Sequence, residues 1–496
     1  MSAAAASGGT FPGARVNPDD PRYPTLVRGF NLRWVGAPRY VELCADTDQV
    51  VRAVQQAVDG GLRITVRGGG HCYEDFVSGN DGGAILDLSA MNAVYLDEAT
   101  GCHVIEGGAT LWDAYVQMYR EYGVTIPGGS CASVGAGGHV CGGGYGLLSR
   151  LHGLTVDHLY GVEIVCVDAS GTARATTVTR DSQDDADWLL MWANLGGGGG
   201  NFGIVTRYLF RDPPAAPSEA HVLSHAWNWC DVDYPAFAQL VANYGGFLAE
   251  NSDVGSPFAG LFSLLHLTQR AGNCPQIVLT AQYVGDEPQL LEDFAQAIEA
   301  GIPSPTGQVA PVGFHGVAVT RDPDIRQLPW LYATQTLNGT GPNQRGKYKS
   351  AYMLEPFPSD QVDTIWTYLT DAANPNPSAL LQVDSYGCQV NAVDPAATAV
   401  PQRSSIMKLQ YQTYWTDPAQ DDANLSWIRD FYTAMYGPDG PVPDGTMDGC
   451  YVNYPDVDLV DWQHLYYKDN YAGLQQAKAT WDPGDVFNHR QSIELP

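Results

Sequence analysis

The sequence predicts an α+β protein, and three observations support this fold class. A strand expected at 39–46, a helix at 47–58 and a short strand at 63–67 lead into a glycine-rich loop, which is an α+β arrangement. In the second half of the chain, strands expected at 276–283 and 404–414 mix with helices, which indicates an antiparallel sheet covered by helices. The length of 496 residues exceeds what one hydrophobic core usually supports, so we expect two domains.

The individual elements follow from hydrophobic periodicity and from their flanking residues. Thr47 and an early acid mark the start of the first helix, and Gly60 and Gly61 end it. The alternating stretch at 162–171 is typical of a hairpin strand. Further strands are expected at 84–88, 93–96, 103–107 and 204–210, and further helices at 111–122, 184–194, 234–251, 288–300 and 360–372.

One glycine run has the spacing of a nicotinamide-cofactor motif. Gly198, Gly200 and Gly203 match G-x-G-x-x-G. The dinucleotide fingerprint requires a strand before the glycines and a helix after them, whereas here a helix precedes and a strand follows. We therefore interpret the run as a tight turn and not as a nicotinamide site.

A proline-rich stretch at 213–217 divides the chain. Its sequence, Pro-Pro-Ala-Ala-Pro, is stiff and is the best candidate for a domain boundary. We expect a first domain over 1–212 and a second domain over 213–445.

The chain is strongly acidic. Aspartate and glutamate number 55 against 26 lysines and arginines, which gives a formal charge of −29 at pH 7. Such a surface repels phosphate backbones and anionic headgroups, so we expect neither nucleic-acid nor membrane partners. No stretch approaches the ~18 consecutive apolar residues of a membrane span.

The 10 cysteines are scattered singly, with no C-x-x-C pair and no Cys/His cluster at zinc spacing. We therefore expect no metal site, and we expect most of these cysteines to be buried reduced thiols. The first ten residues lack the basic and apolar regions of a signal peptide. A cytoplasmic location follows as the expectation, with secretion by a leader absent from this sequence as the alternative.

Two glycine-rich loops carry the strongest chemical signal. Arg67–His71 ends in His71, and the loop at 128–146 contains Cys131. Because glycine has no Cβ, its backbone can approach a flat ligand closely and its N–H groups can converge on a phosphate. Two such loops, each with one strong nucleophile, indicate a ligand site far better than one loop does. No G-x-S-x-G nucleophile motif and no phosphate-binding P-loop occur.

These loops resemble the flavin-binding loops of the berberine-bridge-enzyme-like oxidases, within the vanillyl-alcohol-oxidase/PCMH superfamily. The first matches R-(S/G)-G-G-H, whose histidine bonds the flavin 8α-methyl, and the second matches G-G-x-C-x-x-V-G, whose cysteine bonds flavin C6. Further family strings stand at Leu195–Thr206, Tyr451–Asp456 and Phe487–Ile493, so the resemblance extends over nearly the whole chain.

The resemblance implies a PCMH-type domain that both chain ends form, with the segment 446–496 returning to it. It implies covalent FAD with two attachment points, His71 and Cys131, as in a subgroup that includes sugar oxidases and antibiotic-tailoring oxidoreductases. Val134 would lie beside flavin C4a, where a valine admits O2 and a larger residue tends to exclude it. The other cofactor-binding residues that it implies are Arg67, Gly68, Gly69, Gly70, Gly129, Ser130, Gly135, Gly137, Gly138, His139, Gly203, Ile204, Asn453 and Asn488.

Oxidation of an alcohol also needs a base, because the hydroxyl proton must leave when the hydride does. The resemblance assigns this role to Tyr451, and a tyrosine near its ordinary pKa of ~10 is a poor base at neutral pH. Lys408 and Gln410 lie two apart on one strand and face the same side. We expect Gln410 to orient Tyr451 as a hydrogen-bond donor and Lys408 to support it as a cation. The resemblance also places two tyrosines on the substrate face of the flavin, Tyr145 and Tyr73, and Asp456 is expected to be structural.

The resemblance therefore implies an FAD-dependent oxidase that moves hydride from an alcohol carbon to the flavin and passes the electrons to O2, giving hydrogen peroxide. Its partners would be a small-molecule substrate and O2, in a monomer or small homo-oligomer. The many aromatic residues favour a sugar or a sugar-bearing substrate. Two alternatives stay open: a secondary-metabolite tailoring oxidase that oxidises an aglycone or closes a ring, and a catalytically silent carbohydrate-binding relative.

Overall fold

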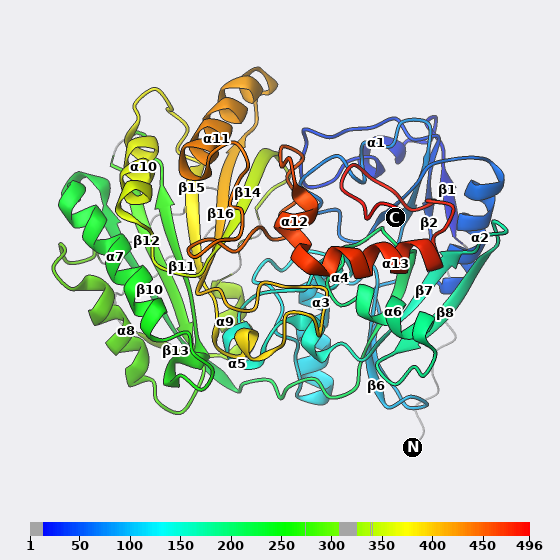
Figure 1. Ribbon diagram of the computed structural model, residues 1–496, viewed down its shortest axis with the longest axis horizontal. Helices are drawn as coiled ribbons and strands as arrows, with labels where there is room; N and C mark the ends of the chain where they lie inside the picture. Colours follow the sequence, from blue (N-terminus) through cyan, green and yellow to red (C-terminus); the bar gives the residue numbers. More distant parts are fainter. Residues whose placement is uncertain (1–12, 273, 307–324, 338, 340) are drawn as a thin grey trace.

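Three β-sheets organise the chain (Figure 1). The computed structural model describes residues 13–272, 274–306, 325–337, 339 and 341–496, and the N-terminal stretch considered above for a signal peptide lies outside them. Helices and strands occur together in every part of the described chain, so the predicted α+β class is confirmed. None of the described helices combines the length and the apolar character that a membrane crossing requires.

The first sheet has four strands in the order β1-β2-β4-β3. Its parallel strands β2 (Tyr40–Leu43) and β3 (Ile64–Arg67) flank β4 (Ala84–Asp87), and β1 (Ala14–Val16) pairs with β2 in antiparallel fashion. Helix α2 (Thr47–Asp59) connects β2 to β3 as predicted. The side chain of Asp46 caps it by accepting a hydrogen bond from the Gln49 N–H, so the cap lies one residue before the predicted Thr47.

The second sheet has five antiparallel strands in the order β5-β6-β9-β7-β8. The predicted hairpin is β7 (Gly161–Val167) with β8 (Ala173–Thr179). The remaining elements of this region are β5 (Val94–Asp97), β6 (Cys102–Glu106), β9 (Ile204–Phe210), and the helices α1 (Tyr23–Leu26), α3 (Leu111–Gln117), which continues as a π-helical turn to Tyr122, α4 (Ala136–Cys141), α5 (Ser149–His152) and α6 (Asp185–Ala193).

The third sheet has seven antiparallel strands in the order β13-β10-β12-β11-β15-β16-β14. The predicted helices α7 (Tyr234–Glu250), α8 (Gln289–Glu299) and α10 (Ser359–Thr370) cover its outer face together with α11 (Asp421–Tyr436), and the two other sheets lie on its other side (Figure 1). Its other elements are β10 (Glu219–Asn228), β11 (Leu261–Thr268), β12 (Gln276–Tyr283), β13 (Arg326–Pro329), α9 (Trp330–Thr336), β14 (Arg345–Met353), β15 (Ala379–Ser385) and β16 (Met407–Trp415).

The C-terminal segment packs against the first two sheets. Helix α12 (Trp462–Tyr467) leads to α13 (Tyr471–Trp481), and the Trp481 indole N–H donates to the Ala186 carbonyl of α6 at 2.9 Å. Phe487 is buried in the core of the four-stranded sheet. The change of sheet falls between Phe210 and Glu219, and we keep the proposed boundaries at 212/213 and 445/446.

Two cysteines depart from the expectation of reduced thiols. Cys230 and Cys274 form a disulfide with a Cα–Cα distance of 5.6 Å, while the other eight cysteines are free. Strands β10 and β12 are antiparallel, and Asn228 lies opposite Gln276. Cys230 and Cys274 each lie two positions beyond this pair, so they are opposite one another as well. The sequence does not give the strand register, and the spacing of single cysteines therefore could not predict the disulfide.

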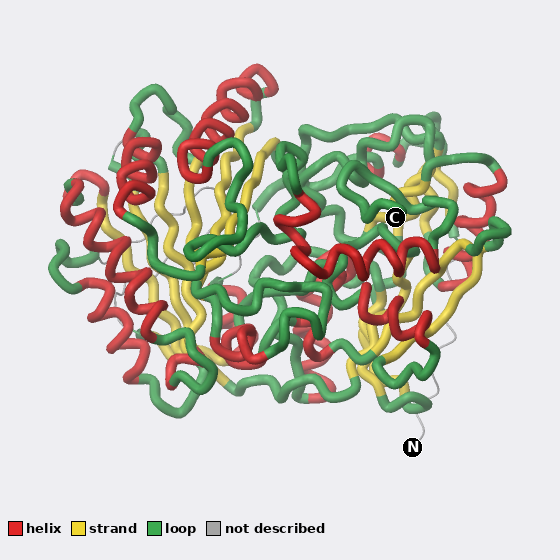
Figure 2. The backbone as a smooth tube through the Cα atoms, viewed as in Figure 1, coloured by secondary structure: helices red, strands yellow, loops and turns green. Residues whose placement is uncertain are grey.

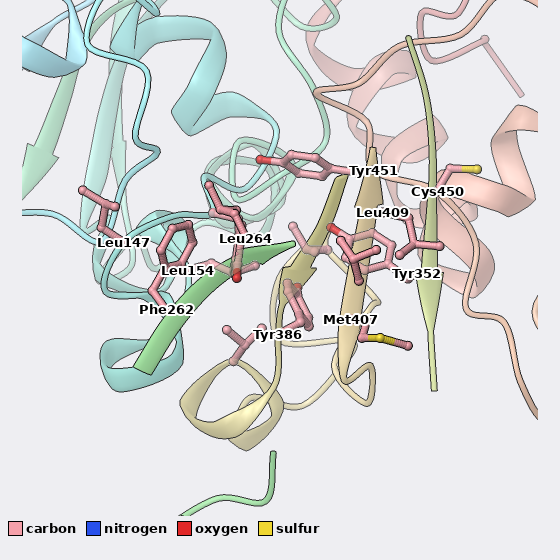
Figure 3. Packing of buried hydrophobic residues seen from close by; sticks show 14 of the residues in the cluster. Leu147, Leu154, Phe262, Leu264, Tyr352, Tyr386, Met407, Leu409, Cys450 and Tyr451 are labelled. Atoms are coloured by element: carbon pink, nitrogen blue, oxygen red, sulfur yellow. The ribbon is translucent and has the colours of Figure 1, made fainter. Parts of the chain in front are cut away.

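Loops fill much of the space between the seven-stranded sheet and the other two sheets (Figure 2). Apolar side chains join the two sides there. Leu147 and Leu154 of the N-terminal part approach Phe262 and Leu264 of β11, with Tyr451 beside them (Figure 3).

Candidate active site

A cavity with a volume of about 340 Å³ lies where the loops meet the seven-stranded sheet. Its walls come from both glycine-rich loops, the glycine turn at 198–203, the inner face of the sheet and the C-terminal segment. Of the predicted site residues, those on the wall are Arg67, Gly68, Gly69, Gly70, His71, Tyr73, Gly129, Ser130, Cys131, Val134, Gly135, Gly137, Gly138, His139, Tyr145, Gly203, Gln410, Tyr451, Asn453 and Asn488.

The two glycine-rich loops pack directly on one another. A Cβ added to Gly69 would lie 2.3 Å from the Gly135 nitrogen, and one added to Gly135 would lie 2.3 Å from the Gly69 nitrogen. These glycines are therefore required by the contact between the loops. Gly138 differs, because it is exposed and a Cβ there would meet no atom within 4 Å.

The two predicted nucleophiles lie on the same wall. The His71 Nε2 is 2.9 Å from the Ser133 hydroxyl, and its ring stacks on Phe30 at a centroid distance of 4.7 Å. Ser133 is two residues from Cys131, so the loop contact brings both nucleophiles together. Burial raises the pKa of the Cys131 thiol to about 11.

This wall fits an FAD. Gly138 has no side chain and no neighbouring atom within 4 Å of its Cβ position, so a ligand can approach the loop backbone closely there. The rest of the wall consists of apolar side chains and backbone groups. His71 and Cys131 are the side chains that would hold the ring system. Among the residues that the structure describes, no three His, Cys, Asp or Glu side chains gather in a way that could hold a metal ion.

Two expected cofactor residues, Arg67 and Ile204, make contacts within the protein. The Arg67 guanidinium is paired with Asp87, with Nε 2.8 Å from Oδ2, and it also donates to the Arg28 carbonyl at 3.2 Å. The guanidinium is therefore engaged by the protein, and the other atoms of Arg67 contribute to the cavity wall. Ile204 is not on the wall: its side chain is fully buried in the core of the four-stranded sheet, because β9 alternates between two packed faces.

His139 and Asn453 brace the second loop, whereas Asn488 bonds within the C-terminal tail. His139 Nε2 accepts a hydrogen bond from the Gly129 N–H at 3.1 Å, and burial lowers the pKa of this imidazole to about 4, so the ring is neutral. The Asn453 amide donates to the His139 carbonyl at 2.9 Å. The Asn488 amide donates to the Asp485 carbonyl at 2.7 Å.

Tyr451 lies on the wall, but its hydrogen-bond partner is not the predicted one. Its hydroxyl accepts from the Asn453 amide at 3.0 Å, whereas Gln410 bonds to the Tyr73 hydroxyl and accepts from Gln412 at 2.9 Å. The expected Gln410–Tyr451 contact is therefore wrong, because Tyr73 of the first glycine-rich loop and Gln412 of the same strand engage Gln410. Burial raises the pKa of Tyr451 to about 12, while the Asn453 hydrogen bond acts in the opposite direction.

The predicted cation is present behind this wall. Lys408 is fully buried, its Nζ lies 4.9 Å from the Tyr145 ring centroid and 5.4 Å from that of Tyr451, and it donates to the Tyr454 hydroxyl at 3.0 Å. Burial lowers the pKa of Lys408, and the Asp384 carboxylate 2.5 Å away raises it.

The two tyrosines of the expected substrate face are both held by other groups. The Tyr145 hydroxyl donates to the Ser385 carbonyl. The Tyr73 ring stacks on Tyr348 at 3.6 Å with an interplanar angle of 7°.

Sequence reasoning missed Gln382, Asp384 and Tyr454. Gln382 and Asp384 alternate with apolar residues in strand β15, which ends in Ser385, and that pattern was an available signal. The register pairs Gln382 with Gln410 and Asp384 with Lys408, which places two polar pairs side by side on the cavity face. Tyr454 was inside a motif that had been noted, but its contact with Lys408 depends on the fold.

Comparison with known proteins identifies the family. Family models match at residues 38–177 (FAD binding domain) and 450–494 (berberine and berberine like). The chain is 43% identical to aclacinomycin-N/aclacinomycin-A oxidase of Streptomyces galilaeus over 97% of this chain and 90% of that protein. It is 38% identical to hexose oxidase of Chondrus crispus over 96% of this chain and 93% of that protein.

A solved structure agrees as well. The crystal structure of a glycopeptide hexose oxidase complexed with teicoplanin superposes with a TM-score of 0.89 at 37% identity, over 97% of this chain and 99% of that one. The chain therefore belongs to the berberine-bridge-enzyme-like family of FAD-linked oxidoreductases.

Proposed function

We propose that this chain is an oxidase that removes hydride from an alcohol carbon of a sugar or a sugar-bearing metabolite and produces hydrogen peroxide from O2. The observation that carries the proposal is the shared cavity of His71, Cys131 and Tyr451. It provides two attachment points for FAD and one acid–base group in the same space. When bound, the flavin supplies the hydride acceptor and the route of electrons to O2.

The protein's own part in this reaction is to take the hydroxyl proton. Tyr451 is a group on the wall that can accept it at its phenolic oxygen. The Asn453 amide donates to that oxygen and stabilises the phenolate, and the Lys408 ammonium beneath the ring favours negative charge there. Asp384 keeps Lys408 in place and opposes the lowering of its pKa by burial.

The substrate side of the proposal rests on the inner face of the sheet. The Gln382 Oε1 lies 3.1 Å from His266 Nε2 and accepts from the Gln412 amide at 3.1 Å, while the Gln382 amide donates to Asp384 at 2.6 Å. Together with Gln410 these groups form a polar band beside apolar Phe262 and Leu264 on the wall. A polar band next to an apolar surface suits a ligand with several hydroxyl groups.

Val134 supports the choice of O2 as acceptor. It is a half-buried residue of the cavity wall, in the loop that carries Cys131 and directly before Gly135, which contacts Gly69. We propose that its short side chain leaves O2 access to the bound flavin.

Tailoring of a secondary metabolite is a second candidate. Two of the similar proteins are named for such molecules, an aclacinomycin oxidase and an oxidase complexed with teicoplanin. Peroxide release from free sugars, compared with glycosylated polycyclic and glycopeptide substrates, separates the two candidates. A silent carbohydrate-binding protein is less well supported, since His71, Cys131, Val134 and Tyr451 all line one cavity.

The decisive experiment tests covalent attachment. Wild-type protein, His71→Ala, Cys131→Ala and the double variant are denatured in acid and their intact masses measured. We expect one FAD on the wild-type chain and on each single variant, and none on the double variant. A wild-type chain that carries no covalent flavin after reconstitution contradicts the proposed attachment.

A further inference from the structure

One of the two edge strands of the seven-stranded sheet, β14, is covered by segments from both ends of the chain. An edge strand exposes backbone groups that need partners. At one end of β14 the Tyr352 N–H donates to Gly449 and the Asp448 N–H donates to Tyr352, both at 2.9 Å. At the other end the Leu32 N–H donates to Gln344 at 2.9 Å. The middle of the strand is held by side chains.

Two buried lysines make these contacts. Lys347 and Lys349 are 1% and 4% exposed. The Lys347 Nζ contacts the Glu74 carboxylate and lies 2.6 Å from the Asp456 Oδ1, whereas the Lys349 Nζ lies 2.6 Å from the Asp456 Oδ2. Both lysines also approach Asp458, at 3.3 and 3.2 Å. Among the described ion pairs, Glu74 is paired with Lys347 and not with Lys349.

The two acids belong to the segments that carry the site. Glu74 directly follows Tyr73, whose ring stacks on Tyr348 of the same strand. Asp456 ends the motif that begins with Tyr451, and its backbone is held by the Tyr466 hydroxyl at 3.0 Å and by the Gln491 amide at 2.8 Å. Since a buried charge without a partner is strongly unfavourable, each acid fixes its segment on β14.

We propose that Lys347 is a positioning residue that fixes the loop of His71 relative to the segment of Tyr451. It is the cation that both segments share, while Lys349 contacts the C-terminal segment alone within this network. The inference rests on the proposed function, because His71 and Tyr451 are its attachment point and its base. Lys347 itself does not touch the cavity wall and acts through Glu74 and Asp456.

Hydrogen exchange of the purified, flavin-loaded protein tests this role without relying on activity. We expect Lys347→Met to speed exchange at least about tenfold in both 72–80 and 451–460. Lys349→Met is the matched control, and we expect it to affect 451–460 alone. Glu74→Gln should affect 72–80 more than 451–460, because its Oε1, which accepts from the Val457 N–H at 3.5 Å, is kept in the glutamine. The peptide 276–283 of β12 serves as the reference for global stability.

The same pattern in Lys347→Met and Lys349→Met overturns the inference, as does faster exchange throughout the chain, reference peptide included. If Lys347→Met does not fold, the double variant Glu74→Gln with Lys347→Met removes one charge of each sign. Faster exchange in both segments of that variant supports the inference, and protected segments overturn it.

Peptide mapping of the flavin adducts gives the second readout. We expect Lys347→Met to lower the fraction of chains linked through His71, and Lys349→Met to leave that fraction unchanged. Equal fractions in the two variants overturn the inference. A wild-type chain without any His71 adduct refutes the proposed function instead, and the exchange pattern then decides on Lys347 separately.

Discussion

Tyr451 is held as a neutral phenol by its surroundings. Burial raises its pKa to about 12, and the hydrogen bond from Asn453 is the largest contribution that lowers it. Below this pKa the phenolate fraction grows about tenfold with each pH unit. We therefore expect anaerobic flavin reduction to accelerate as the pH rises from 7 to 10, measured by stopped-flow absorbance with a substrate found by peroxide release.

Asn453→Leu removes that donor, so it should raise the pKa of Tyr451 further and slow reduction at neutral pH. Gln410→Leu is the control, because Gln410 bonds to Tyr73 in the structure and its loss should not move the profile along the pH axis. A rate that does not change with pH in the wild type would exclude Tyr451 as the titrating base.

Removal of the Tyr451 hydroxyl tests the same role directly. We expect Tyr451→Phe to slow flavin reduction by about 10²–10⁴-fold, the usual contribution of a general base. The covalent flavin should remain, as judged by intact mass. Tyr145→Phe should cost less, because that hydroxyl donates to the Ser385 carbonyl. Equal losses in both variants would argue against a special role for Tyr451.

At the scale of elements, the contact between the two glycine-rich loops should be intolerant of side chains. The Cβ of Gly135→Ala would overlap backbone atoms of Gly69, which cannot move aside as a flexible side chain does. We expect a loss of about 1–3 kcal/mol in the free energy of unfolding, measured by denaturant titration.

Gly138→Ala is the matched comparison, since its Cβ would meet no atom within 4 Å. It should leave the stability of flavin-free protein unchanged and weaken FAD incorporation, measured by flavin absorbance per chain. Wild-type flavin content in Gly138→Ala would show that this glycine does not face the cofactor.

The elements were largely predictable, because their signals are local. The amphipathic helix before Gly60, the hairpin after Gly161 and the glycine turn at 198–203 each depend on periodicity or on nearby turn residues. The loops of His71 and Cys131 were predictable from their motifs.

The partners within the site were not predictable, because they depend on strand register. Gln410 lies between Gln382 and Ser350 across the sheet, and one sequence does not say which strands are neighbours. The Lys408–Asp384 pair could not be predicted for the same reason, because it forms across the neighbouring strands β15 and β16. Ile204 was assigned to the cofactor because it belongs to a motif, although alternation along β9 places its side chain in a core.

At the scale of the whole molecule, the disulfide adds a constraint. Cys230 and Cys274 are separated by 44 residues, and the chain-entropy model gives about 4 kcal/mol for closing a loop of this length. We expect Cys230→Ser to lower the thermal midpoint without changing the flavin content. Non-reducing peptide mapping checks that the bond forms, and an unchanged midpoint would show that it contributes little to stability.

The cavity wall also imposes an order on biosynthesis. Residues 451–455 and Phe487 belong to that wall, and Phe487 also fills the core of the four-stranded sheet. The ribosome releases them after both nucleophiles and all three sheets have been made. A nascent chain thus presents His71 and Cys131 well before it has an enclosed pocket, so we expect the proposed flavin attachment to follow the end of translation.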